Sequence, residues 1–63
     1  MVYNIKISWD PEAVVWIATS EDIPGLVLEC EALDALIERV NLAAPEIIKI
    51  NRLPDASVLH YCC

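Results

Sequence analysis

The residues best suited to chemistry in this chain stand close together, where His60 is followed by Cys62 and Cys63. An imidazole and two thiols offer nitrogen and sulfur ligands to a soft metal such as zinc. In a strand, His60 and Cys62 share a face, and Cys30 joins them only if the fold brings it near. A four-ligand zinc site normally has paired ligands at helical or knuckle spacing, which this sequence lacks. We therefore predict no metal site and no cofactor, and interpret His60 as a residue at the end of a strand.

Carboxylates are the other candidates, as general acids or bases. Asp10 with Glu12, and Glu21 with Asp22, form two pairs in expected loops, where carboxylates are usually solvated. A nucleophile would need His60 beside a cysteine or serine and a third, orienting group, and no such set stands out by residue type and spacing. We therefore predict a protein without catalytic residues that is not an enzyme.

The charge balance is acidic, with ten Asp and Glu residues against four Lys and Arg residues and a net charge of −6. Nucleic-acid binding needs a basic patch, so this composition argues against a nucleic-acid partner. The charge suits a basic protein partner, and it also serves plain solubility. No apolar run approaches the roughly 18 residues of a membrane span. Because Met1–Lys6 lacks the features of a signal peptide, we expect a soluble, cytoplasmic protein.

Residues 1–63 are expected to form one domain, with the element order β-β-β-α-β. Alternating apolar residues indicate strands, and a 3.6-residue period from Leu33 onward indicates a helix. Pro45 predicts a kink or a break in that helix. The expected elements are strands over 3–9, 14–19 and 26–30, helical segments over 33–44 and 46–51, and a strand over 57–62.

These elements predict an α+β fold in two layers, a small, mainly antiparallel sheet with one Pro-kinked helix on one face. If the last strand lies beside the first, the helix forms a right-handed crossover between parallel strands. The other face then has no helix to cover it, and an apolar open face implies a partner. We place Val14, Trp16 and Ala18 on that face as candidate interface residues. Because 57% of this small chain is hydrophobic, we expect a homodimer or a larger homo-oligomer.

The single glycine of the chain predicts a tight turn. Gly25 follows Pro24, and a Pro-Gly pair fits the two central positions of a type II turn. Proline presets φ near −65° at the first position, and glycine accepts the positive φ of the second. We assign Pro24 and Gly25 a structural role in this turn.

Two motifs frame these predictions: a Val-x-Trp-hydrophobic-Ala second strand, and an acidic-Ile-Pro-Gly-Leu turn after it. The residues concerned are Trp9, Asp10, Trp16, Ala18, Asp22, Ile23, Pro24, Gly25, Leu26, Glu29, Leu33, Leu36, Val40 and Pro45. On these residues, roughly Tyr3 to Asn51 resembles the N-terminal domain of HicB-type antitoxins. The chain is more similar still to short, uncharacterised HicB-like bacterial proteins without a DNA-binding domain.

The resemblance implies a β-β-β-α-β layer similar to part of ribonuclease H, with association through sheets and helices. HicB antitoxins cover the active site of HicA, a small basic RNA-cleaving toxin, so the resemblance also implies a basic HicA-like partner. Their second, DNA-binding domain has no counterpart here, so DNA binding is not expected. A ribonuclease H-type metal site needs several converging carboxylates, and the interiors of the expected strands contain only Glu29.

Two functions stay open at this point. The first is a non-enzymatic protein-interaction domain of HicB-like type that neutralises a small basic RNA-cleaving toxin. The alternative is a stand-alone homo-oligomeric domain with a structural or ligand-binding role.

Overall fold

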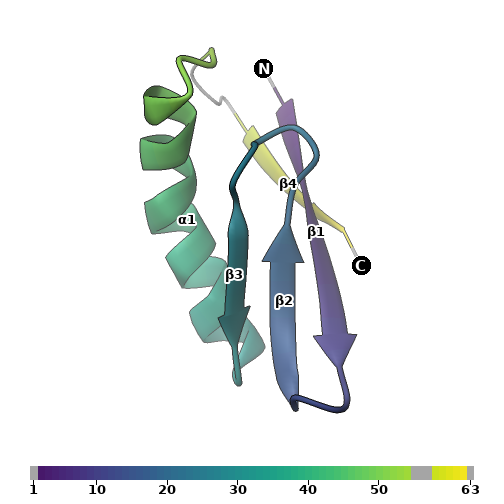
Figure 1. Cartoon of the computed structure of the whole chain (residues 1–63). Coiled ribbons are helices and arrows are strands. Elements are labelled where there is room, and N and C mark those ends of the chain that lie inside the picture. Colours follow the sequence, from purple (N-terminus) through teal and green to yellow (C-terminus); the bar gives the residue numbers. More distant parts are fainter. Residues whose placement is uncertain (1, 55–57, 63) are drawn as a thin grey trace.

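The computed structural model describes residues 2–54 and 58–62. A four-stranded sheet forms one layer and a single helix forms the other (Figure 1). The elements are β1 (Val2–Asp10), β2 (Val15–Thr19), β3 (Val27–Cys30), α1 (Leu33–Ile50) and β4 (Val58–Cys62). The predicted α+β class and the order β-β-β-α-β are confirmed. Over the described ranges, no helix is long and apolar enough to cross a membrane.

The strands are arranged in the order β3-β2-β1-β4. β1 pairs with β2, and β2 with β3, in antiparallel orientation, whereas β4 runs parallel to β1. The sheet is therefore mainly antiparallel, and α1 is the crossover that carries the chain from β3 at one edge to β4 at the other. The last strand lies beside the first, which is the condition under which the helix connects parallel strands as a crossover.

One face of the sheet forms the core with α1. In β1, Tyr3, Ile5 and Ile7 are buried, and the residues between them are exposed, so the period-two pattern separates a helix-covered face from an open one. From α1, buried residues at every fourth position face the sheet, namely Leu36, Val40, Ala44 and Ile48. A step of four residues rotates about 40° beyond one full turn, so the buried stripe drifts by roughly 120° around α1 between Leu36 and Ile48.

The helix continues through Pro45 as one element from Leu33 to Ile50. The predicted break, with a separate helical segment over 46–51, is wrong. Proline removes one backbone hydrogen bond, to the carbonyl of Asn41, and places its ring against that turn. The neighbouring Ala44 and Ile48 are buried on the sheet, and Pro45 itself is exposed. Packing on both sides of the defect therefore holds the helix together where local preference alone would end it.

The ends of α1 are held in different ways. Ala32, the N-cap residue, makes no side-chain capping bond, while Asp34 in the first turn and Lys49 in the last complement the helix dipole. At the C-terminal end, the side-chain amide of Asn51 donates to the carbonyls of Ile47 and Pro24, each over 3.0 Å. The second bond ties the end of the helix to the loop that precedes β3.

Candidate functional site

The Pro-Gly turn has the backbone geometry of a type II turn. Gly25 has φ of 88°, and the N–H of Leu26 donates to the carbonyl of Ile23 over 3.2 Å. Ile23 and Leu26 on either side are both buried in the core. The turn therefore acts as a structural device that returns the chain into the sheet with both flanking side chains inward.

The predicted placement of Trp16 and Ala18 on the open face is wrong. Ala18 is 0% exposed, and it pairs with the buried Ile7 of β1. Residues paired directly across two strands point to the same face, so Ala18 and, two positions earlier, Trp16 point toward α1. Trp16 packs against the core and lies 5.1 Å from Trp9, between ring centroids.

Val14, the third candidate interface residue, precedes β2 and lies in the turn after β1. It has φ of 56°, and 58% of its surface is exposed. The turn is fixed by Asp10, whose Oδ1 accepts the N–H groups of Glu12 and Ala13 over 3.0 and 3.3 Å. An interface role for Val14 and Trp16 stays a prediction, whereas Ala18 has no surface to offer.

The open face is formed by the residues that alternate with the core positions, and it is mixed in character. Cross-strand pairs on it include Lys6 with Thr19, Ile17 with Glu29, and Asn4 with His60. The residues of this open face are Val2, Asn4, Lys6, Ser8, Asp10, Val15, Ile17, Thr19, Val27, Glu29, Val58, His60 and Cys62.

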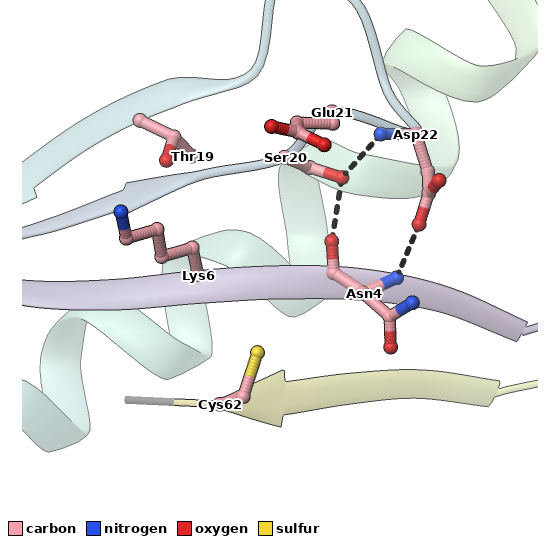
Figure 2. Close-up of a pocket in the computed structure, with 7 residues that line it drawn as sticks. All are labelled: Asn4, Lys6, Thr19, Ser20, Glu21, Asp22 and Cys62. Atoms are coloured by element: carbon pink, nitrogen blue, oxygen red, sulfur yellow. Dashed lines mark hydrogen bonds between the residues drawn. The ribbon is translucent and has the colours of Figure 1, made fainter.

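A cleft of about 510 Å³ lies at one end of the open face (Figure 2). Strands β1, β2 and β4 contribute to it, together with the loop that follows β2. Its lining residues are Asn4, Lys6, Thr19, Ser20, Glu21, Asp22 and Cys62. In Figure 2 the ammonium group of Lys6 extends toward Thr19, and the carboxylates of Glu21 and Asp22 come from the loop.

Hydrogen bonds fix this loop to β1. The hydroxyl of Ser20 donates to the carbonyl of Asn4 over 2.7 Å and accepts the N–H of Asp22 over 3.1 Å. Asp22 Oδ2 accepts the N–H of Asn4 over 2.8 Å. Two side chains thus take over the pairing that β2 would provide if it continued, and they hold Glu21 and Asp22, the acidic rim of the cleft, in place.

The suspected metal ligands do not converge. His60 and Cys62 belong to the open face, where His60 Nδ1 lies 3.2 Å from Asn4 Oδ1 and the thiol of Cys62 donates to the Ile5 carbonyl over 3.5 Å. Cys30 packs against the core on the helix-covered face, and Cys63 lies outside the described residues. Across residues 2–54 and 58–62, no group of three His, Cys, Asp or Glu residues could hold a metal ion.

Two tyrosines on the helix-covered side make long-range contacts that the sequence did not indicate. Tyr3 donates its hydroxyl to the carbonyl of Pro54 over 2.5 Å, and Tyr61 donates to Oδ1 of Asn41 on α1. Burial raises the pKa of the Tyr61 phenol above its ordinary value. The partners are 51 and 20 positions away, so no local motif signals them.

Chemically, the cleft presents charge and hydrogen-bonding groups on a fixed frame. One ammonium group, two carboxylates, two hydroxyls, an amide and a thiol surround a space wide enough for a long side chain or a short peptide segment. The signal available in the sequence was the Ser20-x-Asp22 spacing, which is typical of side chains that bond nearby backbone. Its pairing with Asn4 depends on the fold.

The sheet order and the single covered face define a small two-layer α+β domain. The chain belongs to the family described as a domain of unknown function (DUF1902), whose model matches residues 2–62. It is also similar to the crystal structure of the hypothetical protein TTHA1013 from the extremely thermophilic bacterium Thermus thermophilus. That likeness has a TM-score of 0.85 at 30% sequence identity, and it covers 100% of this chain and 94% of the other. No curated protein matches the chain.

Proposed function

We propose that this chain is a non-enzymatic protein-interaction domain whose open face binds a basic protein, as HicB-type antitoxins bind a small RNA-cleaving toxin. The observation that supports this proposal is the cleft with its acidic rim, on a chain of net charge −6. The class of partner is inferred from the resemblance to HicB, and the cleft is the surface that we assign to it.

The electrostatics of the open face favour a cationic partner. Glu21 and Asp22 border the cleft, Glu29 stands on β3 of the same face, and Lys6 is the one cation among the residues that line the cleft. Glu21 and Asp22 are exposed, and an exposed ion pair contributes about 0.2–1 kcal/mol, so the two carboxylates together give a modest preference for a cationic side chain. An arginine or lysine of the partner would therefore be held at the rim.

The rim is organised before binding. The bonds from Ser20 and Asp22 to Asn4 already fix the loop, so a partner does not have to order it. Ordering a loop on binding consumes part of the interaction free energy, and a prefixed loop avoids this loss. Because the two carboxylates of the rim are on a fixed loop, they also favour one orientation of a bound partner.

The test begins with capture of the tagged chain from its host and identification of bound proteins by mass spectrometry. A small basic protein in near-equal amount is expected. It would then be purified and assayed for RNA cleavage with and without the chain, and inhibition at a 1:1 ratio would support neutralisation. Capture of the chain alone, or a partner that cleaves RNA equally in its presence, would contradict the proposal.

The binding surface is tested with two charge reversals. Glu21→Lys replaces attraction by repulsion at the rim and is expected to weaken binding about tenfold, equivalent to about 1.4 kcal/mol. Glu38→Lys makes the same charge change on α1, outside the cleft, and serves as the matched control. Equal weakening by both variants would show that net charge, and not the cleft, controls binding.

The stand-alone homo-oligomeric domain is the second candidate function. It is favoured by the large apolar side chains that α1 exposes, chiefly Leu42 and Ile50. The two functions use different surfaces, so one chain can serve both.

A further inference from the structure

A second surface lies on the other side of the molecule, between α1 and β3. A groove of about 340 Å³ is lined there by Leu28, Arg39, Leu42, Ala43 and Glu46. Leu42 is 71% exposed, and Ile50, two turns further along α1, is 79% exposed. These are the two most exposed of the large hydrophobic residues in the part of the chain that the structure describes.

The groove side of α1 has a regular pattern. Ala35, Arg39, Leu42, Glu46 and Ile50 follow one another at intervals of four, three, four and four residues. Residues three and four positions apart lie on the same side of a helix, so these five form one stripe. The stripe lies beside the buried stripe that faces the sheet, and Ala43 lies between the two.

This stripe is complementary to the same stripe of a second, antiparallel copy of α1. An antiparallel copy, centred between Leu42 and Ala43, places Arg39 opposite Glu46 of the second copy. The same arrangement places Leu42 opposite Ala43 of the second copy, and Ile50 opposite Ala35. Each charge meets its opposite and each large side chain meets a small one, which is what an isologous two-fold interface requires.

We propose that a second copy of this chain docks on this groove about a two-fold axis, with α1 packed antiparallel against α1. The exposed Leu42 of each copy enters the groove of the other, beside Leu28 and Ala43. Two symmetric Arg39–Glu46 pairs flank the apolar centre. Burial of the exposed Leu42 and Ile50 side chains provides the driving force, and the charges set the register.

The position of β3 agrees with this arrangement. β3 is the edge strand of the described sheet next to α1, and an edge strand presents backbone groups that can pair with another strand (Figure 1). A two-fold axis across the strand direction runs the two β3 edges antiparallel, the orientation in which β3 already pairs with β2. The interface rests on and deepens the homo-oligomeric candidate function, and it does not depend on binding of a basic protein, because the acidic rim lies on the open face.

The test uses charge exchange and measures mass in solution by sedimentation. The unmodified chain is expected to have twice the 7.0 kDa mass of the monomer. Arg39→Glu places a second carboxylate against Glu46, and Glu46→Arg places a second guanidinium against Arg39, each twice per dimer. Each variant is expected to weaken the dimer about tenfold or more.

Recombination of the charges makes the test specific. The double variant R39E/E46R restores both pairs with reversed polarity and is expected to dimerise. Mixing the two single variants also brings only opposite charges together, so a heterodimer is expected. Recovery in the mixture would also show that both single variants are folded.

Two further variants complete the experiment, one as a control outside the groove and one in its apolar centre. Glu38→Lys reverses a charge on α1 outside the groove and is expected to leave the dimer intact, whereas Leu42→Asp is expected to give monomers. The proposal is overturned if the unmodified chain is monomeric, if the single reversals leave it dimeric, or if neither recombination restores association. Loss of the dimer in Glu38→Lys would likewise overturn it, because any charge change would then have the same effect.

Discussion

Replacing Gly25 by alanine isolates the contribution of one backbone angle to stability. Gly25 has φ of 88°, and a Cβ atom added there would meet nothing within 4 Å apart from its two chain neighbours. Steric collision with the rest of the protein therefore contributes nothing, and the whole effect comes from holding an L-residue at positive φ. The flanking Ile23 and Leu26 are fully buried, so the turn cannot shift to relieve that strain.

The expected loss is about 1–2 kcal/mol of the free energy of unfolding. For a chain of this length the total is on the order of 3–9 kcal/mol, so the loss is a large fraction of it. The melting temperature should fall by roughly 5–15 °C. Gly25→Val should cost more, because a β-branched side chain restricts the backbone further.

Urea denaturation followed by circular dichroism measures this loss. Gly25→Asn is the matched control, since asparagine tolerates the left-handed region better than alanine, and it should recover about half of the loss. An alanine variant as stable as the unmodified chain would refute the argument that positive φ at Gly25 is needed. Equal losses for alanine and asparagine would show that the side chain, and not the backbone angle, is responsible.

Three further substitutions test the helix and its contacts by denaturation. Pro45→Ala restores the N–H that bonds the Asn41 carbonyl and should stabilise the chain by about 1–3 kcal/mol; no gain would contradict this. Because burial raises the pKa of Tyr61 above its ordinary value, the folded state holds this proton more tightly, so stability should fall as pH rises above about 10. Tyr61→Phe should remove this contribution to the dependence of the free energy of unfolding on pH. Asn51→Ala removes the bond to the Pro24 carbonyl and should cost about 1 kcal/mol; an unchanged midpoint would argue against it.

The fold could be predicted best where a strand has apolar residues on one face and polar residues on the other. From Tyr3 to Ile7 in β1, apolar and polar residues alternate strictly, and the apolar ones are the buried ones. β2 is apolar on both faces, and nothing in its own composition says which face meets the helix. The register with β1 decides this, since Ala18 pairs with Ile7. The predicted open-face position of Trp16 and Ala18 is wrong for this reason.

Pro45 shows a second limit of local reasoning. The rule that proline ends a helix weighs one lost hydrogen bond and one clash, and both are local quantities. The outcome also depends on how strongly the turns before and after the proline are packed, as Ala44 and Ile48 are here. That packing exists only in the folded chain.

The candidate site was the least predictable part. The sequence draws attention to His60 and its neighbouring cysteines, yet the structure places Cys30 on the opposite face from His60 and Cys62. The cleft depends on Ser20 and Asp22 reaching Asn4, 16 and 18 positions away. From the sequence alone its carboxylates resemble ordinary loop residues, because nothing local marks their neighbours in space.

The parallel pairing of β4 with β1 has a consequence for how the chain folds. It joins residues 56 positions apart, such as Asn4 and His60, whereas β1 and β2 meet over only five positions at Asp10 and Val15. Closing the longer loop costs about 2 kcal/mol more in chain entropy. We therefore expect the β1–β2–β3 meander to form early and β4 to join last. During synthesis on the ribosome, the edge of β1 that pairs with β4 therefore stays unpaired until Val58–Cys62 have left the exit tunnel.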